Sequence, residues 1–116
     1  MSVVNPPPKT TPSGKIMAIV KIPVKEGKEA IATEALKLVQ KRANSEEEPG
    51  TLTYRLMRQL DSQGNLRPVF FLFEEYTDNA AFEEHLASPG VQCFAKALKE
   101  HDVLDGQLSI DYVDDI

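Results

Sequence analysis

The chain has 116 residues, of which 41% are hydrophobic and 27% charged, as in one globular domain with its own core. Its net charge of −5 argues against a nucleic acid as main partner, because phosphate binding requires a basic surface. No apolar run reaches the roughly 18 residues of a membrane span, and a single cysteine excludes an intrachain disulfide framework. We therefore expect a cytoplasmic protein without a membrane partner.

The first fourteen residues, MSVVNPPPKTTPSG, contain four prolines and no long apolar segment, so they do not resemble a secretory signal. This composition predicts a disordered proline-rich arm over residues 1–14, followed by one folded domain over residues 15–116. The acidic clusters SEEEP and DYVDDI are expected to be solvated surface.

The spacing of apolar residues predicts strands and helices separated by Gly, Pro and polar turn signals. In chain order they are strand 15–22, helix 27–44, strands 51–60 and 67–76, a helix ending near Ala87, a helical piece over 91–101, and strand 106–113. The segment DSQGN predicts a hairpin loop in which Gly64 takes a positive φ. Thr77 or Asp78 is expected to cap the second helix, and the SPG at 88–90 to separate the two helical pieces.

The order β-α-β-β-α-β predicts an α+β, ferredoxin-like fold, with a four-stranded antiparallel sheet and its helices on one face. Residues 69–73 are all apolar, so large side chains project from both faces of the third strand. The face without helices would then expose a large apolar patch, and we expect a homodimer that packs sheet on sheet to bury it. The alternative is that the N-terminal arm covers this face.

The strings EPGTLTYRL at 48–56 and FLFEEYTDNAAFEEHLASPG at 71–90 carry the patterns E-P-G-x-x-x-Y and E-x-Y…A-x-x-x-H-x-x-S-P. In these patterns the chain resembles the antibiotic biosynthesis monooxygenase family of dimeric α+β barrels, over roughly residues 15–113. The resemblance implies that fold and its dimer. The family includes cofactor-independent quinol and anthrone monooxygenases, haem-degrading enzymes, small isomerases and members without a known activity.

The haem-degrading branch has an Asn on the first strand, a Trp on the second helix and a His further along. Here Val20, His85 and Ala95 occupy those places, and the chain has no Trp. The resemblance therefore implies no haem, and we expect no cofactor. It also implies that position 85 faces the pocket between the sheet and the helices.

His85 lies three residues after Phe82 and four after Ala81, so it shares their apolar side of the predicted helix. A mostly neutral imidazole in such a place can accept a proton. As catalytic residues we predict His85, which would deprotonate the substrate for reaction with O2, and Tyr76, which would orient it. The alternative is a packed histidine in the core or at a dimer contact.

Further candidates are expected to bind a small aromatic substrate. Glu74 shares a strand face with Tyr76 and needs a partner, such as Arg55, Arg58 or a backbone N–H. Tyr54 is expected to point inward because it alternates with leucines. The candidate walls are Met17, Phe70, Phe82 and Phe94. Met and aromatic residues at such spacings also occur as plain core.

We therefore predict a cofactor-independent monooxygenase of an aromatic quinol, anthrone or polyketide-like substrate. Two alternatives stay open, because a fold does not determine a function. One is an isomerase or cyclase that uses the same base without O2. The other is a dimer that binds a small ligand without turnover.

Overall fold

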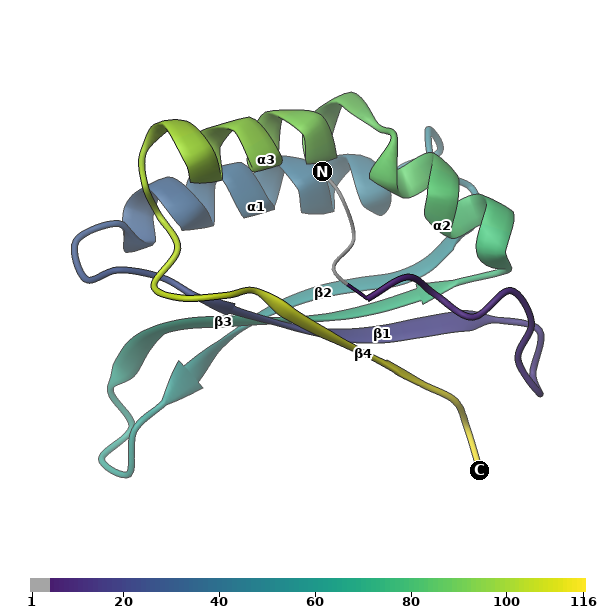
Figure 1. The fold of residues 1–116 in the computed structure, drawn as a ribbon, viewed down its shortest axis with the longest axis horizontal. Coiled ribbons are helices and arrows are strands. Elements are labelled where there is room, and N and C mark those ends of the chain that lie inside the picture. Colours follow the sequence, from purple (N-terminus) through teal and green to yellow (C-terminus); the bar gives the residue numbers. More distant parts are fainter. Residues whose placement is uncertain (1–4) are drawn as a thin grey trace.

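The computed structural model describes residues 5–116, and its elements confirm the predicted α+β, ferredoxin-like order (Figure 1). They are β1 (Ile16–Pro23), α1 (Glu29–Ala43), β2 (Thr51–Leu60), β3 (Leu66–Tyr76), α2 (Asn79–Leu86), α3 (Pro89–Glu100) and β4 (Ser109–Val113). The strands form one antiparallel sheet in the order β2-β3-β1-β4, and all three helices cover the same face of it.

The central strand β1 determines which side chains of β3 face the helices. Its residues Ile16, Ala18, Val20 and Ile22 are at most 5% exposed, as expected for the set that points into the core. The register pairs Ala18 with Glu74, so this carboxyl group also points to the helix side, among apolar neighbours.

The other face of the sheet, which we call the open face, is covered by no element among residues 5–116 (Figure 1). The half-buried Phe71 and Phe73 of β3 project there, because they alternate with the buried Phe70 and Leu72. Beside them lie three more exposed apolar residues, Ile19 (42%), Met57 (36%) and Val113 (37%). The apolar run of β3 thus places large side chains on both faces of the sheet.

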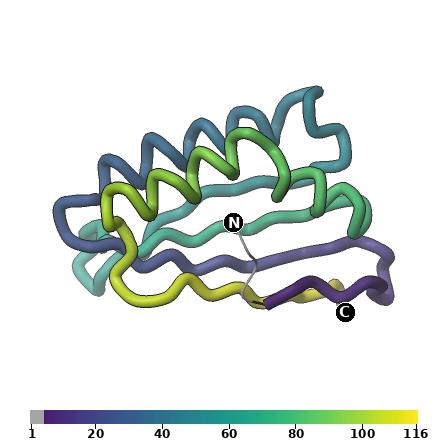
Figure 2. The backbone as a smooth tube through the Cα atoms, turned by 45° about the horizontal axis from the view of Figure 1, so that its top comes forward, coloured from purple at the N-terminus to yellow at the C-terminus, as the bar shows by residue number. Residues whose placement is uncertain are grey.

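Residues 5–14 of the predicted arm lie beside β4, at the edge of the sheet (Figure 2). Asn5 Nδ2 donates to the carbonyl of Ile110 (3.1 Å), and the Tyr112 hydroxyl donates to the carbonyl of Asn5 (2.6 Å). Asn79 Nδ2, on α2, donates to the carbonyl of Pro8 (3.2 Å). These hydrogen bonds connect the described part of the arm to β4 and α2, because extended proline-rich backbone offers its carbonyls to donors on two elements. The predicted disorder of the arm stays a prediction. Residues 1–4 lie outside the described residues.

Two predicted boundaries differ from the structure. The SPG segment does not lie between α2 and α3 as a whole, as we had predicted. Ser88 caps α3, since its Oγ accepts from Val91 N (3.3 Å), and Pro89 is already the first residue of α3. β4 begins at Ser109 rather than at 106, since Gly106 takes a φ of +94° in a turn. Other local predictions are confirmed: Asp78 caps α2, and Gly64 has a φ of +83°.

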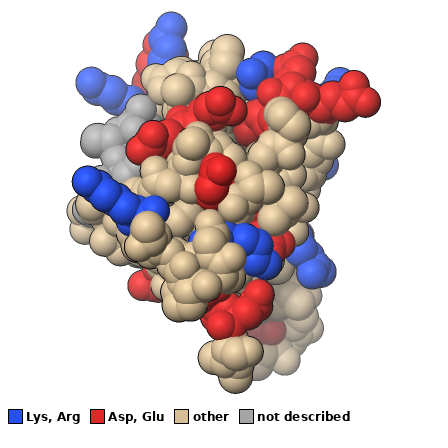
Figure 3. Space-filling view, turned by 90° about the vertical axis from the view of Figure 1, so that its right-hand side faces the viewer, with Lys and Arg blue, Asp and Glu red and all other residues tan. Residues whose placement is uncertain are grey.

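The surface shown in Figure 3 carries acidic and basic side chains interspersed with uncharged ones, with no continuous basic stripe on that side. Among the described helices, none combines the length and the apolar composition that a membrane crossing needs.

Candidate functional site

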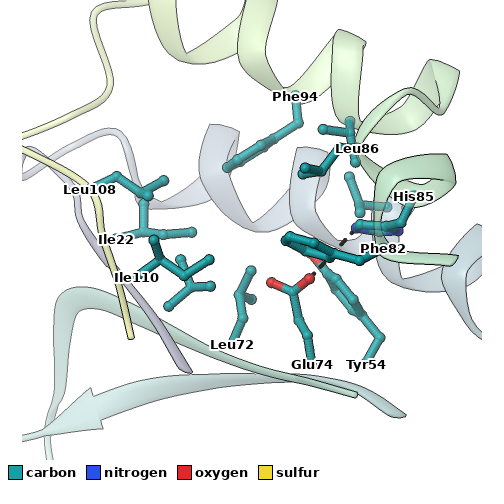
Figure 4. A pocket seen from close by; sticks show the side chains of 13 residues that line it. Ile22, Tyr54, Leu72, Glu74, Phe82, His85, Leu86, Phe94, Leu108 and Ile110 are labelled. Carbon is teal, nitrogen blue, oxygen red and sulfur yellow. Dashed lines mark ion pairs between the residues drawn. The ribbon is translucent and has the colours of Figure 1, made fainter. Parts of the chain in front are cut away.

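A cavity of about 50 Å³ lies between the sheet and the helices (Figure 4). Of the described residues, only Tyr54, Glu74 and His85 bring polar side chains to it. The apolar lining consists of Val20, Ile22, Val39, Leu72, Phe82, Leu86, Val91, Phe94, Leu108 and Ile110. Such a volume holds a few water molecules, for which about 10–15 Å³ each suffices, but it is smaller than the roughly 150 Å³ of a cavity that binds benzene.

His85 lies in the last turn of α2, and its side chain is only 3% exposed. Its ring contacts carboxyl groups on two sides: Nδ1 lies 2.6 Å from Glu48 Oε1, and Nε2 lies 3.8 Å from Glu74 Oε1. The second distance is too long for a hydrogen bond. One ring nitrogen is thus engaged, and the other, on the side of Glu74, has no hydrogen-bond partner within residues 5–116.

Glu48 comes from the loop between α1 and β2 and is 7% exposed. Its Oε2 forms an ion pair with Arg42 Nε (3.2 Å), and Thr51 Oγ1 donates to its Oε1 (3.4 Å). The expectation that all acids of SEEEP are solvated is therefore wrong for Glu48. The E-P-G pattern marked this residue, but a glutamate before a Pro-Gly break has no local signature of burial.

Glu74 is 5% exposed, on β3 opposite Tyr54 of β2. The Tyr76 hydroxyl donates to its Oε1 (2.5 Å). Burial raises the pKa of Glu74, and the hydrogen bond from Tyr76 and the proximity of His85 oppose this rise only in part. Relative to an exposed glutamate, the site therefore favours the neutral carboxylic acid.

Neither arginine that we predicted as a partner of Glu74 contacts it. Arg58 donates to the carbonyl of Arg67 (3.0 and 3.1 Å) and lies over the ring of Phe70. Arg55 is exposed and pairs with Phe73 on the open face. The prediction of an arginine partner was wrong. Residues two apart on one strand share a face, so Tyr76 lies beside Glu74 and donates to it instead.

Two tyrosine rings flank the imidazole, each with its centroid 5.3 Å from that of His85. Tyr54 lines the cavity, whereas Tyr76 is completely buried behind Glu74 and is not part of the lining. Burial raises the pKa of both phenols, and the nearby Glu74 and Glu48 raise it further. Both are therefore neutral hydrogen-bond donors over the ordinary pH range.

Of the predicted apolar walls, the cavity brings together Phe82 and Phe94. Phe70 is buried in the core but does not line the cavity. Met17 alternates with the inward residues of β1 and pairs with Glu75, so it lies on the other face of the sheet. These two residues had the right side-chain chemistry, but the alternation of β1 and the position of Phe70 along β3 place them elsewhere.

The site is a largely apolar cavity with one imidazole, one carboxyl group whose pKa is raised by burial and one phenol. Such a set can remove a proton and donate hydrogen bonds to the anion that forms. Among residues 5–116, no three His, Cys, Asp or Glu side chains are placed to hold a metal ion.

Comparison with known proteins gave one family match. The family model described as antibiotic biosynthesis monooxygenase matches residues 15–97. A comparison with curated proteins found no match.

Among solved structures, a proposed antibiotic biosynthesis monooxygenase from Caulobacter crescentus is 22% identical, with a TM-score of 0.75 over 90% of this chain and 92% of that one. PA3566 from Pseudomonas aeruginosa is 20% identical, with a TM-score of 0.75 over 90% and 96%. Rv0793 from Mycobacterium tuberculosis is 18% identical, with a TM-score of 0.72 over 88% and 95%. At such identities these structures establish a shared fold.

Proposed function

The chain belongs to the antibiotic biosynthesis monooxygenase family, and from that premise we propose that it is a cofactor-independent monooxygenase of a small aromatic quinol or anthrone. One observation carries the proposal. His85 is buried at a largely apolar cavity, with Nδ1 held by Glu48 and Nε2 left without a hydrogen bond among residues 5–116. This is the placement that a general base requires.

In the proposed reaction, Nε2 of His85 accepts the proton of a substrate hydroxyl or enol. The resulting anion is electron-rich enough to pass electrons to O2, so the substrate itself is the reductant. For an anthrone, one oxygen atom enters as a carbonyl at the former CH2 carbon and the other leaves as water. The atoms and electrons then balance without a further co-reactant. The apolar walls limit the access of water to the anion.

Glu74 and Tyr54 are proposed to donate hydrogen bonds to the oxygen that becomes negative. The raised pKa of Glu74 favours its protonated form, in which the carboxyl O–H is a donor close to the base. The hydroxyl of Tyr54 has no hydrogen-bond partner within residues 5–116, so its donor is free. Tyr76 acts through Glu74, whose orientation it fixes.

The cavity volume limits the substrate. Because about 50 Å³ is less than an aromatic ring needs, a ring enters only when lining side chains move. Leu86 and Phe94 close the cavity on the helix side (Figure 4). We therefore propose that the aromatic substrate is seated by displacement of these two side chains.

We also propose that the protein is a cytoplasmic homodimer. The open face combines Ile19, Met57, Phe71, Phe73 and Val113, and the described part of the arm runs along β4 instead of covering it. A second copy that packs sheet on sheet would bury this patch. The two copies would then form a dimer with two-fold symmetry, the commonest symmetry among oligomers.

The test is O2 uptake with a monocyclic hydroquinone, a naphthohydroquinone and an anthrone. Replacing His85 by alanine is expected to lower the rate about 10²–10⁴-fold, the usual contribution of a general base. His101→Ala is the matched control, because the other histidine of the chain is exposed at the end of α3.

Equal rates in the two variants would exclude His85 as the base. Conversion that persists without O2 would indicate an isomerase or cyclase instead. Binding of these compounds without conversion would indicate a ligand-binding dimer.

A further inference from the structure

We infer that Glu48 is a positioning residue, which holds His85 in the tautomer with its proton on Nδ1 and so leaves the lone pair of Nε2 for the substrate. This inference rests on the proposed function for its consequence in catalysis. The tautomer itself can be measured without any substrate.

The first support is the contact between Glu48 and His85. The two side chains are 7% and 3% exposed, and Glu48 Oε1 lies 2.6 Å from Nδ1. A carboxylate can only accept hydrogen bonds, so Nδ1 must donate. Because a neutral imidazole carries one N–H, Nε2 is then the acceptor. When Nε2 takes a proton, the new imidazolium lies against a carboxylate.

The second support is that Glu48 is itself held from the other side. Arg42 Nε lies 3.2 Å from Glu48 Oε2, and Arg42 Nη1 lies 2.5 Å from Oε2 of the exposed Glu47. Arg42 comes from α1, Glu48 from the following loop and His85 from α2. Within residues 5–116, Arg42 Nε and Glu48 Oε2 form an ion pair without a hydrogen bond, so Arg42 attracts the carboxylate, and the bond between Glu48 and Nδ1 orients the imidazole.

Other charged and titratable groups also face His85, and they act on it differently. Glu74 and Tyr76 come from β3, and Tyr54 comes from β2. Nε2 is 3.8 Å from Glu74, with no hydrogen bond between them. Within residues 5–116, the bond to Glu48 is therefore the one that selects a tautomer.

A purely structural role for Glu48 would be to tie α2 to the loop before β2. A glutamine, of the same shape, could keep such a tie. It would not keep the tautomer. The amide oxygen would face the cation of Arg42, which cannot accept a hydrogen bond, so the amide N–H would donate to Nδ1 and move the ring proton to Nε2. Glu48→Gln thus separates the two roles, and Glu47→Gln is the control, since Glu47 shares Arg42 but lies 65% exposed.

The experiment is nitrogen NMR of the His85 ring in the full chain, together with O2 uptake. The wild-type ring is expected to show the proton on Nδ1, and Glu48→Gln to shift it to Nε2 with a loss of about 10²-fold or more in uptake. Glu47→Gln should match the wild type. Glu48→Asp keeps the acceptor and should retain the wild-type tautomer.

A wild-type ring with its proton on Nε2, or a Glu48→Gln ring unchanged from the wild type, would overturn the inference. If Glu48→Gln does not fold, the wild-type spectrum still decides. If the spectra are as expected but no compound is oxidised, the inference holds and the proposed function fails. If uptake depends on His85 but not on Glu48, the proposed function stands and the positioning role is wrong.

Discussion

Replacing Gly50 by alanine tests how closely the turn that carries Glu48 packs against the helix that carries His85. A Cβ atom at Gly50 would lie 2.5 Å from Ala81 Cβ and 3.2 Å from Thr77 Oγ1. Since carbon atoms pack best at roughly 3.5–4 Å, the turn and α2 would have to separate by about 1 Å. Thr77 N also donates to the carbonyl of Gly50 (2.9 Å), so the two segments cannot separate freely.

Overpacking of this kind costs about 1–3 kcal/mol. For a domain of this size, that corresponds to a fall in Tm of about 4–12 °C. We also expect O2 uptake to fall, because a separation of α2 from the turn lengthens the contact between Glu48 and His85.

The assay is urea and thermal unfolding, with Gly90→Ala as the control. A Cβ at Gly90 would meet Val39 Cα at 3.7 Å, an ordinary contact, and in α3 an alanine is favoured by up to about 1 kcal/mol over glycine. The clash at Gly50 involves one methyl group, so Ala81→Gly should restore part of the loss in the double variant. Additive effects in that double-mutant cycle, or a Gly50→Ala variant as stable as the wild type, would refute the close packing.

Three further changes test other parts of the structure. Glu74→Gln should raise the free energy of unfolding at neutral and higher pH but not in acid, as measured by urea unfolding at about pH 4 and pH 8. A carboxyl group whose pKa is raised in the folded state contributes its full stability below its unfolded pKa. The wild type loses that contribution as the pH rises through the folded pKa, whereas glutamine does not titrate. Ile19→Lys should convert the proposed dimer to a monomer in light scattering, while Leu38→Lys, on α1 and 63% exposed, should not. Tyr112→Phe should speed amide exchange in the arm around Asn5 and cost no more than about 1 kcal/mol, since it removes one exposed hydrogen bond.

Each of these three predictions has a result that would contradict it. A Glu74→Gln variant with the same pH dependence as the wild type would mean that the carboxyl group is ionised at low cost in the fold. A wild-type protein that is monomeric at micromolar concentration would remove the reason for a sheet-on-sheet dimer. Unchanged exchange in the arm would mean that other contacts hold it.

The fold could be predicted from the sequence because its signals are local. The alternation in β1, the helical spacing of α2 and the turn at Gly64 each depend on residues close in the chain. The inward direction of His85 followed from its distance to Phe82 in the same helix. The start of α3 was missed for a local reason too, since Pro89 can either end one helix or begin the next.

The site could be predicted only in part, because it depends on which distant segments meet. Glu48 and His85 are 37 positions apart. The residues next to Glu48 in the sequence do not indicate that its carboxylate is buried between an arginine and a histidine. The predicted partners of Glu74 were arginines on the neighbouring strand, chosen by charge. The structure satisfies that carboxyl group with a phenol instead.

The arm also has a consequence for the order in which the molecule is assembled. Asn5 is bonded to residues 105 and 107 positions later in the chain, whereas the family match begins only at residue 15. Contacts between residues so far apart carry the largest loop-closure cost and form late. During synthesis the arm emerges before β4 and has to wait for it, so these contacts at the edge of the sheet form only after residues 110–112 have been made.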